Sequence, residues 1–68
     1  MEKSWTKIFS SPNLQKTELI KSLLAHNGIQ SIIVNQQDSF YRFGDIELFV
    51  NRNDVIKATF VLKKNNIE

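Results

Sequence analysis

The sequence predicts an α+β fold whose elements follow the order strand, helix, strand, strand, helix. Segments rich in β-branched and aromatic residues alternate with two amphipathic segments, and only nine residues separate the last two strand-like segments. The 68 residues suffice for one domain, spanning residues 1–68, and no more. A chain this short buries only about 60% of the surface that its unfolded form exposes, so a second chain could contribute to its stability.

The chain is expected to open with a strand and a helix. Residues Trp5–Ser10 are aromatic and β-branched, which is typical of a strand. The following helix is expected to run from Leu14 to Asn27. Ser11 would cap it, and Pro12 would take the first helical position, where a missing N–H costs nothing.

The first helix has one apolar face and a clear stop signal. At about 100° per residue, four side chains fall on one side and predict the core face: Leu19, Ile20, Leu23 and Leu24. Gly28 follows directly, where a left-handed C-cap is expected.

Two strands and a second helix are expected to complete the domain. The strands are Ile29–Gln36 and Ile46–Val50, and the connection Gln37–Asp45 is short enough for an antiparallel hairpin. The second helix is expected over Asp54–Lys64, with a cap from one of the asparagines that precede it, Asn51 or Asn53.

Chain handedness predicts how these elements are arranged. A right-handed crossover leaves strands 5–10 and 29–36 parallel, and strand 46–50 then fits between them, antiparallel to both. Both helices would cover one face of the sheet. The prediction is a ferredoxin-like two-layer sandwich whose three-stranded antiparallel sheet lacks the fourth strand, which leaves the outer edge of strand 5–10 unpaired.

The other face of the sheet is expected to carry aromatic side chains. If Ile8 faces the helices, alternation places Trp5, Phe9 and Phe49 on the far side, joined by Ile33 or Val34. An uncovered apolar patch of this kind marks an interface on a small protein. The alternative is a register that differs by one residue, which would turn the aromatic side chains inward.

Two further features suggest contact sites. Ile56 and Phe60 form an i, i+4 pair away from the expected core stripe of the second helix, which indicates either a helix-mediated contact or a loosely packed helix rim. The connecting loop contains Phe40, Tyr41, Arg42 and Phe43, and these residue types are common in binding hot spots. The loop aromatics could instead plug the open end of the core, or stack bases.

The sequence offers no constellation for catalysis. His26 is the only histidine, and cysteine is absent, which excludes thiol nucleophiles and cysteine-based zinc sites. The carboxylates Asp38, Asp45 and Glu47 are expected to be solvated turn and strand residues. Gly28 and Gly44 are the only glycines, so no phosphate-binding glycine-rich motif is present. No enzyme activity, cofactor or metal is therefore expected.

Charge and composition narrow the partners. The net charge is +2 and no basic run exceeds Lys63-Lys64, so nucleic-acid binding is not expected. No apolar stretch approaches the length of a membrane span, and no signal peptide is expected. The absence of cysteine favours a reducing, cytoplasmic location.

The order of motifs resembles a prokaryotic family of signal-transducing proteins that is described as a domain of unknown function. The resemblance covers about residues 4–63, and the matching segments are the opening Trp5–Asn13, Glu18-Leu19, Leu23-Leu24, Gly28-Ile29, Val34-Asn35, Ile46–Val50, and Asp54 with Ala58 and Leu62. It implies a PII-like, ferredoxin-like fold. PII-type regulators are trimeric and contact partners through the loop between their second and third strands, so residues 40–43 would occupy the equivalent loop.

Together these observations predict a regulatory or adaptor module that acts by protein–protein contact, as a homo-oligomer. The alternative is a small-ligand sensor that binds a metabolite between subunits or under the loop of residues 37–45.

Overall fold

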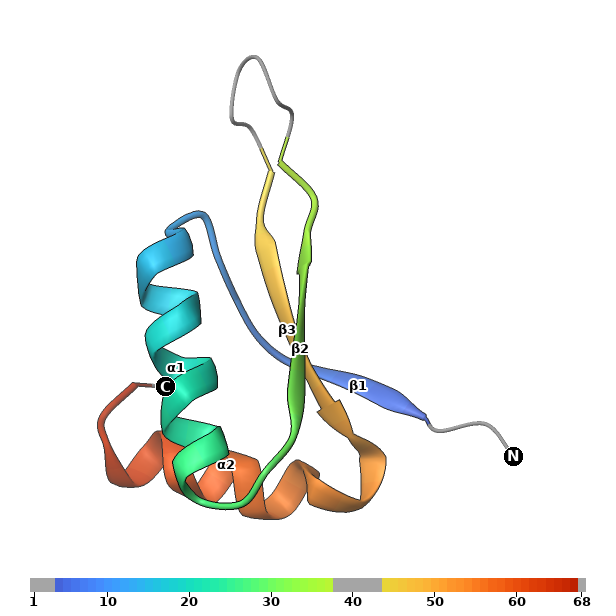
Figure 1. Cartoon of the computed structure of the whole chain (residues 1–68), viewed down its shortest axis with the longest axis vertical. Helices are drawn as coiled ribbons and strands as arrows, with labels where there is room; N and C mark the ends of the chain where they lie inside the picture. Colours follow the sequence, from blue (N-terminus) through green and yellow to red (C-terminus); the bar gives the residue numbers. More distant parts are fainter. Residues whose placement is uncertain (1–3, 38–43, 68) are drawn as a thin grey trace.

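The computed structural model describes residues 4–37 and 44–67 of the chain (Figure 1). Its elements are β1 (Trp5–Ser11), α1 (Leu14–His26), β2 (Ser31–Asn35), β3 (Ile46–Asn51), a single 3₁₀ turn η1 (Arg52–Asp54) and α2 (Val55–Lys64). The predicted α+β class and element order are confirmed, with boundaries that differ by at most a few residues.

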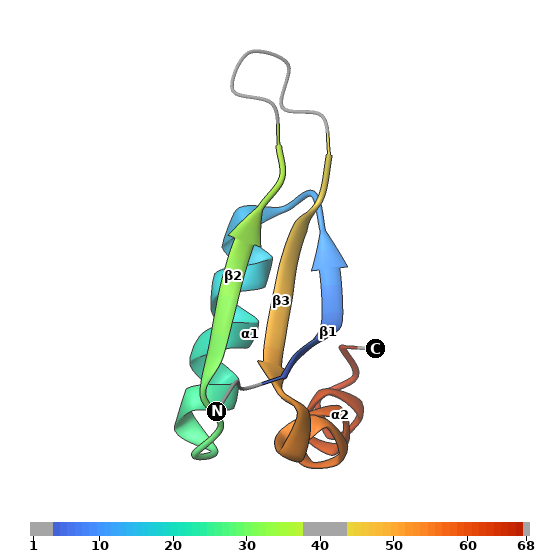
Figure 2. The ribbon, with the colours of Figure 1, turned by 90° about the vertical axis from the view of Figure 1, so that its right-hand side faces the viewer.

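The three strands form one sheet in the order β1-β3-β2 (Figure 2). The central strand β3 pairs antiparallel with both neighbours, as predicted. Both outer strands are therefore edges of the sheet within the described residues. This arrangement is compatible with a small ferredoxin-like fold.

The hydrophobic core lies on one side of the sheet. β3 places Ile46, Leu48 and Val50 there, each fully buried, in line with the predicted alternation. Both helices contribute to the core cluster, so both cover this same side: Ile20, Leu24, Ile29, Leu48, Val50, Ala58, Val61 and Leu62.

The start of α1 differs from the expectation for Ser11 and Pro12. Asn13 is the N-cap, and its side chain accepts a hydrogen bond from the backbone N–H of Lys16 at 3.0 Å. The Ser11 hydroxyl instead accepts from the N–H of Asn13 at 3.1 Å. Pro12 therefore precedes the helix, because an asparagine one position later satisfies the free helical N–H group.

The core face of α1 is also rotated from the predicted one. Leu19 is 69% exposed, so its predicted place in the core is wrong, whereas Thr17 is fully buried beside Ile20 and Leu24. The Thr17 hydroxyl donates to the carbonyl oxygen of Asn13 at 2.9 Å. A threonine can occupy a core position when its hydroxyl is hydrogen-bonded inside its own helix. The buried side of α1 is therefore centred closer to Thr17 than predicted.

α1 ends in a Schellman motif, as the glycine predicted. Gly28 has a φ of +79° and donates to the carbonyl oxygen of Ala25, and Ile29 donates to that of Leu24 at 2.9 Å. Ile29 is buried against the core, so the motif also fixes the direction in which the chain leaves the helix.

α2 ends in the same way without a glycine. Asn66 adopts a φ of +58°, and Ile67 donates to the carbonyl oxygen of Leu62 at 2.9 Å. Ile67 then packs against the core, as Ile29 does after α1.

A β-bulge interrupts the pairing of β1 with β3. Lys7 lies opposite Phe49 and Phe9 lies opposite Leu48, so Ile8 is an extra residue. Because side chains alternate along a strand, one extra residue moves every later side chain to the other face. Ile8 packs against the core as predicted, but Phe9 packs there too, so its predicted position on the far face is wrong.

The hairpin between β2 and β3 is closed by backbone contacts at its base. Gln36 donates to the carbonyl oxygen of Asp45 at 3.1 Å, and the Gln37 side chain reaches the carbonyl oxygen of Pro12 at 2.9 Å. Gly44 has a φ of +106° and lies tightly against the backbone of Gln36. The base of the hairpin is thereby tied to the β1–α1 connection.

Candidate functional site

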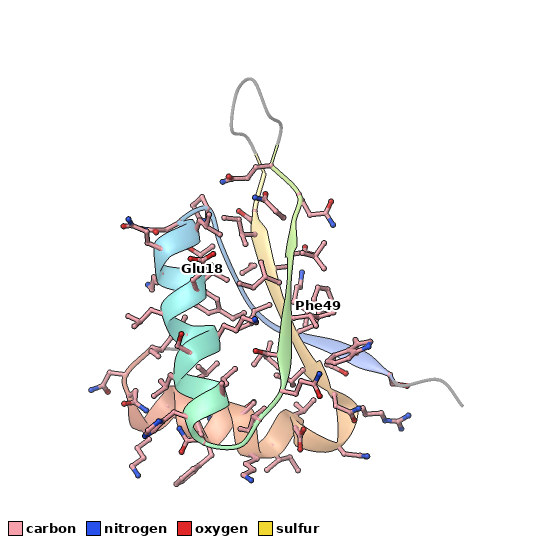
Figure 3. All side chains as sticks on the ribbon, in the orientation of Figure 1. Glu18 and Phe49 are labelled. Atoms are coloured by element: carbon pink, nitrogen blue, oxygen red, sulfur yellow. The ribbon has the colours of Figure 1, made fainter. Side chains whose placement is uncertain are left out.

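The side of the sheet away from the helices carries a patch of apolar side chains. The strand register places Trp5 on β1, Ile32 and Val34 on β2, and Phe49 on β3 on this side. We call these four residues the open sheet face. Figure 3 labels Glu18 on α1 and Phe49 on the sheet, and the Phe49 side chain lies on the side of the sheet that faces away from α1.

The open sheet face is centred on Phe49. This residue lies on the middle strand, directly opposite Ile32 of β2, and Trp5 is its diagonal neighbour across β1. Direct and diagonal neighbours are within reach of aromatic side chains. All four residues are partly buried although neither helix covers them.

A polar pair borders this surface. Lys7 and Glu47 also lie on the open side, and Lys7 Nζ is 3.5 Å from a Glu47 carboxylate oxygen. The Lys7 side chain is 52% exposed. An exposed ion pair contributes little to stability. Lys7 lies directly opposite Phe49 and Glu47 directly opposite Val34, so the pair places opposite charges beside these apolar side chains.

A second exposed apolar site lies on α2. Ile56 is 86% exposed and Phe60 is 65% exposed, as the helical spacing predicted. With Val55, Thr59 and Lys63 they line a shallow hollow on the helix surface. We call Ile56 and Phe60 the helix patch.

A groove of about 500 Å³ runs between α1 and the outer edge of β2. Its lining combines opposite charges, two hydroxyls, one amide and a few apolar groups: Glu18, Lys21, Ser22, Ala25, Ile29, Gln30, Ser31 and Ile33. Ser31 is only 8% exposed, and within residues 4–37 and 44–67 its Oγ has no hydrogen-bond partner. Sequence reasoning missed this residue, because only its pairing with Val50 shows that it points towards the helices.

The structure brings together only some of the predicted contact residues. Trp5 and Phe49 share the open sheet face, whereas Phe9 is drawn into the core by the bulge. The neighbours on β2 are Ile32 and Val34, because Ile33 pairs with Leu48 on the helix side. The predicted loop residues Phe40, Tyr41, Arg42 and Phe43 lie outside the described residues.

The described side chains form no cluster of three or more histidine, cysteine, aspartate or glutamate residues that could hold a metal ion. His26 is exposed in the last turn of α1. In the part of the chain that the structure describes, no helix has the length and apolar character needed to cross a membrane.

The chain was compared with known protein families, curated proteins and solved structures. No family model, curated protein or solved structure matches the chain.

Proposed function

We propose that this chain is a non-enzymatic contact module that binds another protein through its open sheet face. The main support for this proposal is that Trp5, Ile32, Val34 and Phe49 lie together on a side of the sheet that neither helix covers. Aromatic residues at the centre of a patch are typical of binding hot spots. The ion pair of Lys7 and Glu47 beside these residues would orient the partner rather than supply most of the affinity.

The role that suits such a module is a regulatory or adaptor component of bacterial signal transduction in the cytoplasm. The resemblance of residues 4–63 to the PII-like signal-transducing family supports this proposal, and so does the compatibility of the strand order with a ferredoxin-like sandwich. Residues 40–43 would then add a second contact.

Paired charge substitutions test the proposal. Tagged wild-type chain and the variants Phe49→Glu and Ile56→Glu are used to capture partners from the source cells under identical conditions. A partner bound by the wild type and by Ile56→Glu, but lost with Phe49→Glu, is the expected result, because only Phe49 belongs to the open sheet face. Retention of every partner by Phe49→Glu would exclude the face as the docking site. Circular dichroism of both variants checks that they are folded.

A second candidate function is a small-ligand sensor. The groove between α1 and β2 favours it, since polar side chains and the unpartnered Ser31 hydroxyl line a hollow of ligand size. Thermal unfolding in the presence of nucleotides and amino acids tests this function. A raised midpoint that is lost in Ser31→Ala is expected, and the absence of any shift would argue against it.

A further inference from the structure

The two edges of the sheet differ in how well they are protected against pairing with another strand. β1 has two protective features, because it is bulged at Ile8 and exposes the Lys7 side chain. Bulges, lysines and covering segments are the usual devices that block edge pairing.

β2 has none of these devices. Its five residues, Ser31–Asn35, pair one to one with β3 without a shift, and they contain no charged residue, proline or glycine. A regular apolar edge of this kind is a template for an additional strand.

The pattern of polar and apolar residues in β2 reads the same in both directions. It reads Ser31, Ile32, Ile33, Val34, Asn35, with a polar residue at each end and apolar residues between. In an antiparallel pair centred on Ile33, polar residues face polar residues and apolar residues face apolar ones. A two-fold axis produces this kind of self-complementary contact.

We propose that two copies of this chain pair their β2 strands antiparallel about a two-fold axis at Ile33. The two three-stranded sheets then become one continuous sheet of six strands. Ser31 faces Asn35 of the second copy, and Ile32 faces Val34 of the second copy. This pairing stands apart from the proposed function, because it uses the edge of the sheet and needs no other protein.

The pairing satisfies the buried hydroxyl of Ser31. Asn35 is exposed, and its Oδ1 already accepts the backbone N–H of Gln37 at 2.8 Å, which leaves its Nδ2 as a donor. Directly opposed residues have their Cβ atoms about 4.5–5.5 Å apart, which is within hydrogen-bonding reach of a serine hydroxyl. Each copy of Ser31 Oγ therefore accepts from Asn35 of the other copy. A buried polar group without a partner costs free energy, so this bond favours the dimer.

The surroundings of β2 admit a second strand. The groove between α1 and β2 leaves space on the helix side for Ile33 of the second copy. The groove surface of α1 carries one acid and one base, Glu18 and Lys21, so no like-charge cluster opposes the approach. On the other side, contact between Ile32 and Val34 joins the two open sheet faces into one surface.

Sedimentation equilibrium of the full chain at high micromolar concentration is the first test. A dimer is expected, and Val34→Lys should weaken it by about tenfold or more, because lysine on an edge opposes strand pairing. Ser10→Lys is the matched control, since Ser10 is exposed on the same side of the sheet but on β1. A wild-type chain that stays monomeric, or equal losses in both variants, would overturn the proposal.

Cysteine pairs test the register, because the natural chain contains no cysteine. Ser31→Cys and Asn35→Cys are mixed and oxidised, and a disulfide-linked heterodimer is expected on a non-reducing gel. Either variant alone should stay uncrosslinked, since equivalent positions are then offset by four residues, roughly 13 Å, beyond the ~7 Å limit for a disulfide. Crosslinking of a single variant, or equal yields in every sample, would overturn this register. Failure of the mixture to crosslink, with a dimeric wild type, would also overturn this register.

Discussion

Trp5 and Phe9 lie four residues apart on β1, yet their side chains lie on opposite faces of the sheet. Trp5 faces away from the helices opposite Asn51, and Phe9 packs against the core opposite Leu48. In a regular strand, residues four apart share one face. The bulge at Ile8 separates them, so that one aromatic residue of β1 packs against the core and the other lies on the open sheet face.

This division predicts different costs for two aromatic truncations. Phe9→Ala should lower the free energy of unfolding by about 2 kcal/mol, somewhat less than a fully buried phenylalanine would, because Phe9 is only partly buried. Phe49→Ala should cost less, since no helix packs over that face. Urea denaturation of both variants measures the difference. A larger loss for Phe49→Ala would contradict the assignment of the two faces.

The two glycines should respond differently to alanine. At Gly44 a new Cβ would lie 2.8 Å from the carbonyl oxygen of Gln36, in addition to the strain of a φ of +106°. Gly44→Ala should therefore destabilise the chain by about 2 kcal/mol or more. At Gly28 nothing lies within 4 Å of the new Cβ, so only the strain of a φ of +79° remains, at about 1 kcal/mol. Thermal unfolding of both variants ranks them, and the reverse order would refute the tight packing at Gly44.

The end of α2 offers a stabilising substitution. Asn66 occupies the left-handed position that glycine fills after α1. Asn66→Gly should therefore retain or raise stability by a few tenths of a kcal/mol. Asn66→Val should lower stability by about 1–2 kcal/mol, because a β-branched side chain disfavours this conformation. Denaturant midpoints for the pair provide the measurement, and equal midpoints would speak against a left-handed residue here.

The cap of α1 can be tested in the same way. Asn13→Ala removes the acceptor for the Lys16 N–H and should cost about 1 kcal/mol. Asn13→Asp should keep the cap and add a favourable charge at the helix N-terminus. If Asn13→Ala unfolds at the same urea concentration as the wild type, the cap contributes nothing.

The sequence predicted the central strand of the fold well. Ile46, Leu48 and Val50 alternate strictly with polar or outward residues, and a strand with one buried face has only one acceptable register. Of the two helix ends, the sequence predicted only the first. Gly28 is a specific signal for the left-handed residue after α1, whereas asparagine, which takes this position after α2 as Asn66, is common in many other contexts.

The candidate site was harder to predict because it depends on pairing between distant segments. Nothing local marks Ile8 as a bulged residue, since no glycine or proline stands beside it. The side of the sheet on which Phe9 lies therefore depends on how β1 pairs with β3, which the sequence of β1 alone does not show. Ser31 presents the same difficulty, because a serine inside a predicted strand gives no sign of its side until its pairing with Val50 places it on the helix side of the sheet.

The position of Trp5 has a practical consequence. It is the only tryptophan of the chain, and it lies on the open sheet face rather than in the core. Its fluorescence therefore reports on that face without any label. A partner that covers the face would shift the emission of Trp5 to shorter wavelength. A ligand confined to the groove between α1 and β2 would leave the emission unchanged, so one spectroscopic signal separates the two kinds of binding.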